Sequence, residues 1–155
     1  MLISKLTINN FRGIKSTTLY PTDHVVLIGD NNVGKTSILE AIDLAMGPDR
    51  LNHRPVIDEH DFYAGKYLKE EGETNNPHIY IEVVITNLNE EQQRRFNAEL
   101  EYWDTKTNDI AHSINDVEEN GIPCIRISFD GYYDQEEDNF KGETFFTRGE
   151  VEGNK

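Results

Sequence analysis

The chain has little cysteine, no long apolar segment and few basic residues. Its 155 residues include one cysteine, Cys124, so no internal disulfide can form, and its apolar neighbours Ile122 and Ile125 indicate a buried thiol without a catalytic role. No apolar run approaches the roughly 20 residues that span a bilayer, and the start of the chain lacks the apolar core of a signal peptide. These absences predict a cytoplasmic protein with no membrane partner.

Positive charge is scarce. Lysine and arginine number 15 against 29 aspartates and glutamates, which gives a formal net charge of −14. Such a field repels the phosphate backbone of nucleic acids unless basic residues gather on one face, and no such gathering is visible in the sequence. We therefore expect DNA to be reached only indirectly, through other domains or a partner. The length suits a single globular domain with a real core.

The first half of the chain predicts a hairpin, a strand and a helix. Alternating apolar residues predict a strand over 2–10 and a second over 14–20, joined through Arg12-Gly13. A wholly apolar run over 25–28 predicts a central strand. The helical spacing that follows begins near Thr36 and stops at Gly47-Pro48, and its expected buried stripe is Ile38, Ile42, Ala45 and Met46.

The second half predicts strands around one more helix. We expect strands over 79–85, 122–129 and 143–147, the last one weak, and a helix over 90–103. That helix would be capped by Asn87 or Asn89 and would use Phe96, Leu100 and Trp103 as its apolar side. Residues 49–76 predict a long surface connection anchored by Val56, Ile57, Phe62 and Tyr63. Residues 149–155 hold no apolar anchor and predict a disordered tail.

Residues 29–36 form a complete phosphate-binding motif. They read Gly-Asp-Asn-Asn-Val-Gly-Lys-Thr, the P-loop spacing G-x-x-x-x-G-K-[ST], between an expected strand and an expected helix. Gly29 and Gly34 permit a tight turn that aims backbone N–H groups at an anion, and the helix adds its positive end. Lys35 supplies a mobile charge to the β and γ phosphates, and the Thr36 hydroxyl suits Mg²⁺. The motif predicts nucleotide binding.

A GTPase requires further motifs that the sequence lacks. There is no Asp-x-x-Gly, and the guanine-reading Asn/Thr-Lys-x-Asp fails because Thr105-Lys106-Thr107 is followed by Asn108. A second candidate, Asn154-Lys155, reaches the last residue given. The sequence therefore disfavours a GTPase.

The residues before and within the P-loop carry a family resemblance. The start of the chain reads Leu2-x-x-x-Leu6-x-Ile8-x-Asn10-Phe11-Arg12-Gly13. This start and the P-loop resemble the N-terminal lobe of RecF, Rad50 and SMC-type ABC ATPases. They resemble more closely the ATPase part of OLD-family (overcoming lysogenization defect) nucleases, whose loops read Gly-x-Asn-Asn-x-Gly-Lys-[ST]-[ST]. The matching residues are Gly29, Asn31, Asn32, Gly34, Lys35, Thr36 and Ser37. Asp61-Phe62-Tyr63 is similar to a short Asp-Phe element of that family.

The resemblance is specific over residues 1–46 and implies a fold and site roles. The fold would be α/β, an ABC/RecF-like P-loop NTPase N-terminal lobe with a mixed β-sheet, occupying residues 1–148. The residues from Asn31 to Ser37, Val33 included, would wrap the phosphates of ATP, with Lys35 as the catalytic charge and Thr36 on Mg²⁺. Arg12 would approach the phosphates from the hairpin. Its alternative role is a turn arginine in a surface ion pair.

Groups that ABC-type hydrolysis requires are absent from the sequence. No apolar strand ends in Asp-Glu after the P-loop, since the candidate over 56–59 has two apolar residues, follows Pro55 and lies too early. There is no Ser-Gly-Gly signature and no acidic Toprim nuclease cluster. We therefore expect a partial domain that holds half of an ATP site, hydrolyses little ATP alone and is completed by a homodimer or a partner chain.

Three functions remain open at this point. The first is the ATP-binding domain of an OLD-like ATP-dependent DNA endonuclease or defence ATPase. The second is the lobe of a RecF/Rad50-like DNA repair ATPase, and the third is a nucleotide-binding module without turnover. A metal site at Asp58-Glu59-His60-Asp61 is a weaker possibility, because consecutive polar residues in a loop are more often a solvated surface.

Overall fold

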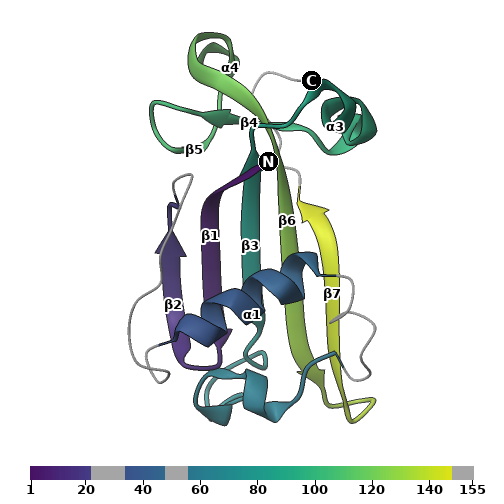
Figure 1. Ribbon diagram of the computed structural model, residues 1–155. Helices are drawn as coiled ribbons and strands as arrows, with labels where there is room; N and C mark the ends of the chain where they lie inside the picture. Colours follow the sequence, from purple (N-terminus) through teal and green to yellow (C-terminus); the bar gives the residue numbers. More distant parts are fainter. Residues whose placement is uncertain (22–33, 48–55, 148–155) are drawn as a thin grey trace.

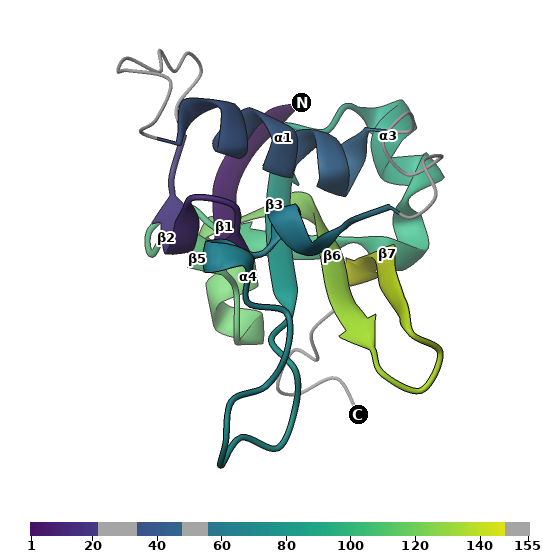
Figure 2. The same cartoon turned by 90° about the horizontal axis from the view of Figure 1, so that it is seen from below.

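Within the described residues, one long helix lies across one face of an antiparallel sheet (Figures 1 and 2). The structure is a computed structural model that describes residues 1–21, 34–47 and 56–147. The expected strand over 25–28, the loop residues Gly29, Asn31, Asn32 and Val33, and the expected tail over 149–155 lie outside the described residues.

The sheet is built from strands distant in sequence. Its strand order is β2-β1-β3-β6-β4-β5, and β7 also pairs with β6. The bounds are β1 Leu2–Phe11, β2 Ile14–Leu19, β3 Ile79–Thr86, β4 Glu101–Asp104, β5 Asp109–Ile110, β6 Gly121–Asp134 and β7 Asn139–Thr147. Every pairing among these strands is antiparallel. The mixed sheet expected from the sequence requires a parallel partner, and the described strands contain none.

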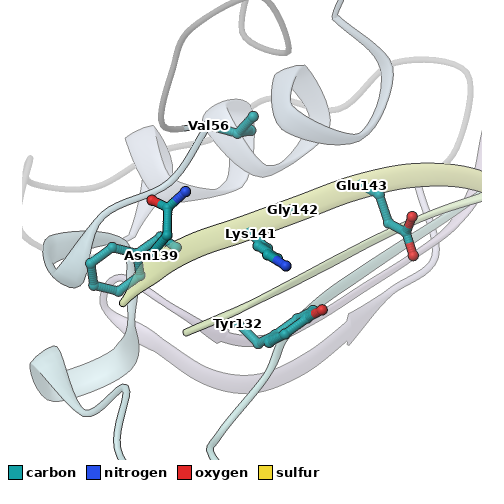
Figure 3. Close-up of a pocket in the computed structure, with 7 residues that line it drawn as sticks. Val56, Tyr132, Asn139, Lys141, Gly142 and Glu143 are labelled. Atoms are coloured by element: carbon teal, nitrogen blue, oxygen red, sulfur yellow. The ribbon is translucent and has the colours of Figure 1, made fainter. Parts of the chain in front are cut away.

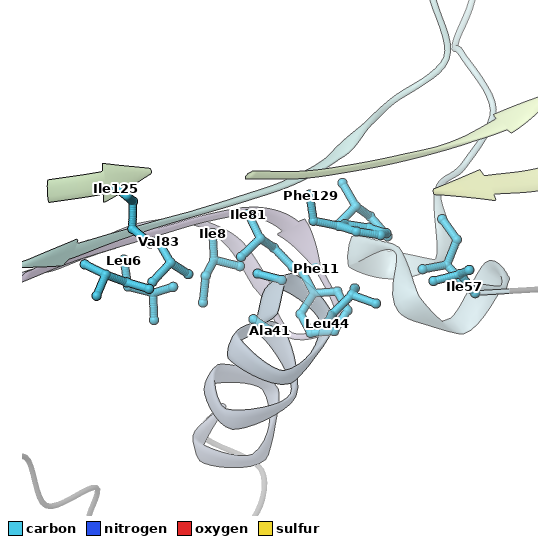
Figure 4. Packing of buried hydrophobic residues seen from close by; sticks show 14 of the residues in the cluster. Leu6, Ile8, Phe11, Ala41, Leu44, Ile57, Ile81, Val83, Ile125 and Phe129 are labelled. Carbon is cyan, nitrogen blue, oxygen red and sulfur yellow. The ribbon is translucent and has the colours of Figure 1, made fainter. Parts of the chain in front are cut away.

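The helix α1 (Lys35–Met46) packs on the sheet through small and branched side chains. Ala41 and Leu44 are fully buried against strand residues that include Ile8 and Ile81 (Figure 4). Full burial of one Leu- or Ile-sized side chain stabilises by roughly 1.5–3 kcal/mol. Hydrophobic packing on the sheet is therefore the main support for the position of α1.

The predicted buried stripe of α1 is partly wrong. Of the residues named for it, Ala45 is buried, Ile38 and Ile42 are half-buried, and Met46 is 37% exposed. The buried face of the helix is formed instead by Ala41, Leu44 and Ala45, of which only Ala45 was in the predicted stripe. The predicted end is confirmed, since the Gly47 N–H donates to Asp43 O at 2.6 Å and closes the helix.

The described part of the connection, residues 56–76, is anchored to the core more firmly than a surface loop. It contains two short 3₁₀ turns, η1 (Glu59–Asp61) and η2 (Tyr63–Gly65). Phe62 between them is 1% exposed and forms an isolated bridge with Phe11 at the end of β1. Val56 and Ile57 are also buried, as predicted, whereas Tyr63 is 37% exposed. Three of the four expected anchors are therefore confirmed.

The predicted helix over 90–103 is wrong in its second half. Asn89 caps α3 (Glu90–Arg95) with a reciprocal capping box, but the helix stops at Arg95 and a 3₁₀ turn, η3 (Asn97–Glu99), follows. Trp103 lies instead on β4, where it is 4% exposed and belongs to a small second core with Val84 and Cys124. The helix α4 (Ile114–Asn120) and the strand β5 were not predicted. No helix in the described ranges is long and apolar enough to span a membrane.

Candidate functional site

The start of α1 has the geometry that the P-loop sequence requires. Gly34 stands at the helix N-cap with φ 90°, a left-handed conformation that side-chain-bearing residues rarely adopt. Its carbonyl accepts the N–H of Ile38 at 3.0 Å, which closes the first turn. Because Gly34 has no side chain, no N-cap side chain competes with an external acceptor for the amides at the start of α1. The local geometry favours an anion at this end.

The described P-loop residues occupy the first turn of the helix. Lys35 and Ser37 are half-buried and Thr36 is exposed. The structure therefore presents a lysine and two hydroxyls at the positive end of α1. Gly29, Asn31, Asn32 and Val33 lie outside the described residues, so their predicted contacts with phosphate remain predictions.

Arg12 is held beside α1 by two carboxylates. It lies in the turn between β1 and β2 with φ 50°, and its N–H donates to Asp61 O at 2.8 Å. Its Nε and Nη2 both reach Asp61 Oδ1 at 3.1 Å, while Nη1 forms an ion pair with Glu40 of α1. We call this set, Arg12 with Asp61 and Glu40, the Arg12 clamp. It joins the hairpin, the helix and the 3₁₀ turns at one point.

Residues 58–61, weighed above as a metal site, use their carboxylates internally. Asp58 accepts the N–H of His60 at 2.8 Å, and Asp61 Oδ2 accepts the N–H of Asp58 at 3.0 Å. These bonds form a capping box that begins η1. Within the three described ranges no group of three or more His, Cys, Asp or Glu side chains is placed to hold a metal ion. The segment acts here as a support for Arg12.

Two pockets with Gly13 in common lie at the end of the P-loop and at Arg12 and Asp61 of the clamp. One, of about 360 Å³, is lined by Gly34 and Ile38 of the helix region, by β2 residues from Ile14 to Thr17 and by Gly13 and Tyr63. The other, of about 610 Å³, is lined by Arg12, Gly13, Asp61 and neighbouring residues of η1 and η2. Gly13 lines both. Since Gly13 directly follows Arg12, the clamp arginine is adjacent in sequence to the pocket at the end of the P-loop.

A further hollow at the β6–β7 hairpin contains none of the described P-loop residues. It measures about 440 Å³ and is lined by Val56, Tyr132 and residues 139–143 of β7 (Figure 3). Its one cation, Lys141, contacts Glu137 at 2.9 Å and Asp134 at 3.0 Å, and these hydrogen bonds raise the pKa of the Lys141 ammonium. The lysine is paired with two carboxylates, and no described P-loop residue lies beside it to add a second anion-binding group.

Sequence reasoning missed Glu40 and the contact between Asp61 and Arg12. The Asp61-Phe62 element carried part of the signal, because an aspartate beside a buried phenylalanine indicates a turn fixed to the core. The partner of that aspartate could not be read from the sequence, since Asp61 and Arg12 are separated by 49 residues. Glu40 resembles any solvent-facing helix residue, and it carried no signal of its own.

Comparison with known proteins agrees with this geometry. A 28% identical segment of 86 residues is shared with an uncharacterized protein, YbjD, of Escherichia coli strain K12. The match covers 56% of this chain and 14% of that protein, so the chain spans a small part of the length of its relative. The model of the AAA ATPase domain matches residues 1–145, which include the P-loop, the hairpin and the sheet. The chain therefore belongs to the AAA ATPase domain family of P-loop ATPases.

Proposed function

We propose that this chain is the ATP-binding N-terminal lobe of an OLD-like ATP-dependent DNA endonuclease or defence ATPase. The observation that carries the nucleotide part is the left-handed Gly34 at the start of α1, followed directly by Lys35, Thr36 and Ser37. Membership of the AAA ATPase domain family supports it. The OLD-like part draws its support from the Asn31-Asn32 pair of the loop and from the Asp61-Phe62 element.

Each residue of the first turn has a distinct task in this proposal. The Lys35 ammonium neutralises the β and γ phosphates of ATP and the charge that grows on them during transfer. The Thr36 hydroxyl is an oxygen ligand for a Mg²⁺ ion that keeps most of its water. Gly29, Asn31, Asn32, Val33, Gly34 and Ser37 wrap the phosphates with backbone N–H groups and short polar side chains.

The proposal includes an incomplete active site. The sequence given offers no acidic strand to position Mg²⁺ and water, and no signature helix to contact the γ phosphate. A partner chain, or sequence beyond the residues given, would supply these groups, because a second copy of this sequence lacks them as well. We therefore expect binding of Mg²⁺-ATP with little or no hydrolysis by this chain alone.

Calorimetric titration with Mg²⁺-ATP and Mg²⁺-GTP tests the nucleotide part. Lys35→Ala should weaken ATP binding by roughly tenfold or more, because a phosphate-paired ammonium is lost. Lys69→Ala, which removes an exposed lysine far from the motif in sequence, is the matched control and should bind like the wild type. Equal affinities of wild type and Lys35→Ala would contradict the proposal, and preference for GTP would revive the GTPase interpretation.

Two further measurements test the finer parts. Phosphate release from the same samples should stay near the uncatalysed background, and steady turnover by this chain alone would contradict the half-site. ATP-dependent cleavage of DNA by the whole protein that contains this lobe would support the OLD-like assignment. DNA binding without cleavage would favour the RecF/Rad50-like alternative.

A further inference from the structure

The two carboxylates of the Arg12 clamp hold the guanidinium from different sides. Nε and Nη2, which form one edge of the group, point to Asp61, whereas Nη1 points to Glu40. The backbone N–H of Arg12 adds a third bond to Asp61, through its carbonyl oxygen. Asp61 therefore determines the orientation of the Arg12 side chain, and Glu40 contacts only Nη1.

Burial makes the two partners unequal. The Asp61 side chain is 5% exposed and also accepts the Asp58 N–H, so η1 fixes its position. The Glu40 side chain is 37% exposed, although its Oε2, the atom next to Arg12, is shielded from solvent. A buried carboxylate with several donors cannot leave without exposing them, whereas a partly exposed carboxylate with one charged partner leaves at a lower cost. Glu40 is the exchangeable side of the clamp.

Arg12 is next in sequence to the pocket at the end of α1 that binds phosphate in the proposed function. Glu40 and Lys35 lie on the same helix, and Gly13 next to Arg12 lines the pocket that also contains Gly34. To contact an anion in that pocket, Arg12 would exchange Glu40 for the anion on Nη1 and keep its bonds to Asp61. A planar guanidinium that keeps one edge on a carboxylate can offer the other to a phosphate oxygen.

We infer that Asp61 is a positioning residue for Arg12, and that Glu40 is a competing carboxylate that nucleotide phosphate displaces from it. This inference rests on the proposed function. In the nucleotide-free chain Glu40 pairs with Nη1 of Arg12. When Mg²⁺-ATP binds, a phosphate oxygen replaces Glu40 on Nη1 while Asp61 keeps Nε and Nη2. Glu40 therefore weakens nucleotide binding, and Asp61 strengthens it.

Titration of the full chain with Mg²⁺-ATP tests the inference through paired variants. Glu40→Gln should tighten binding by about two- to fivefold, the range expected for one surface ion pair. Asp61→Asn should weaken it by about tenfold, because Arg12 loses its charged anchor. Both effects should vanish in an Arg12→Ala background. A change that persists without Arg12 would overturn the inference, since a merely structural role does not depend on the arginine.

The matched control is Asp43→Asn, which removes one carboxylate from the same helix. It should leave the affinity near that of the wild type, and an increase equal to that of Glu40→Gln would overturn the inference in favour of a general charge effect. If Asp61→Asn does not fold, the Glu40→Gln and Arg12→Ala pair decides the question alone. In that case, unchanged or weaker binding by Glu40→Gln overturns it.

The outcomes separate this inference from the function beneath it. A wild type that binds no Mg²⁺-ATP overturns both. If the wild type binds Mg²⁺-ATP, Lys35→Ala abolishes this binding and Glu40→Gln leaves it unchanged, only the inference is overturned. The Arg12 Nε–H signal in nuclear magnetic resonance adds a readout without nucleotide, because it should stay protected in Glu40→Gln and lose protection in Asp61→Asn.

Discussion

The backbone of Gly142 lies directly against the ring of Phe129. A Cβ atom at position 142 would stand 2.6 Å from Phe129 Cζ, and one at Gly131 would stand 2.9 Å from Cε1 of the same ring. Gly131 and Gly142 face each other in the β6–β7 register. The two glycines therefore provide the space in which Phe129, a fully buried core residue, is accommodated.

Gly142→Ala should destabilise the protein by about 1–3 kcal/mol, the usual cost of overfilling a packed site. Urea unfolding followed by circular dichroism measures this. Gly13→Ala is the matched control, because a Cβ there meets no atom within 4 Å. Its free energy of unfolding should change by less than about 0.5 kcal/mol. Equal unfolding midpoints for the two variants would contradict this account of Phe129.

The pair of Glu101 and Arg126 predicts a second stability effect. Arg126 donates from Nε and Nη2 to the two Glu101 oxygens, both at 3.0 Å, and the Glu101 side chain is 4% exposed. Glu101→Gln should cost about 2–3 kcal/mol, because the charge of a largely buried arginine loses its main partner. Glu70→Gln, which removes the exposed partner of Lys66, should produce no measurable change in thermal unfolding. Similar losses in both variants would contradict the prediction.

Cys124 should be chemically silent in the folded protein. Burial, and next the nearby Glu101 carboxylate, raise the pKa of its thiol to about 12. Since the thiolate is the reactive form, a thiol reagent such as DTNB in mildly alkaline buffer should label the chain only after denaturation. Prompt labelling of the native protein in stoichiometric amount would show that the second core around Trp103 opens readily.

The ion pair between Lys5 and Asp109 predicts an acid-sensitive contact between β1 and β5. Partial burial raises the pKa of the Asp109 carboxyl, but hydrogen bonds from Lys5 and from the Ile110 N–H hold it below its ordinary value of 3.8. A depressed carboxyl pKa contributes stability that is present above the ordinary value and is lost as the pH falls through the lower, folded value.

Asp109→Asn should therefore remove part of the stability at neutral pH, at most about 1 kcal/mol because the pair is partly solvated, and almost none in strong acid. Thermal unfolding of wild type and variant across the acid range measures the difference. A loss of the same size at all pH values would assign the effect to packing rather than to charge.

The sequence predicted those elements whose signals are local. The alternation in β1 and the β-branched run of β3 identify strands without knowledge of their partners. Two asparagines before an acidic first turn indicate the start of α3, and the structure selects Asn89 of the two as the cap. The error over 96–103 has a physical cause. Phe96, Leu100 and Trp103 have helical spacing, but Trp103 pairs with Ile122 across β4 and β6, and this tertiary contact overrides the local pattern.

The candidate site divides in the same way. Gly34 and Lys35 could be predicted because the P-loop is a continuous motif whose residue types have fixed tasks. The anchoring of Arg12 could not be predicted, because its two carboxylates come from a helix and from a 3₁₀ turn in different parts of the chain. Short β4 and β5 were missed because two to four residues carry too little periodicity to identify a strand.

The bridge between Phe11 and Phe62 sets the smallest fragment that can carry the site. Arg12 is oriented only when the turn at Asp61 is packed on the core through Phe62. Aromatic rings support this packing, because Phe62 contacts Phe140 of β7, and Phe140 lies 5.2 Å from Tyr67 between ring centroids. A peptide that ends with α1 would contain the whole P-loop motif but would lack Asp61, Phe62 and Phe140. Nucleotide affinity should therefore be a property of the assembled sheet, and unfolding of β7 should loosen Arg12 from a distance.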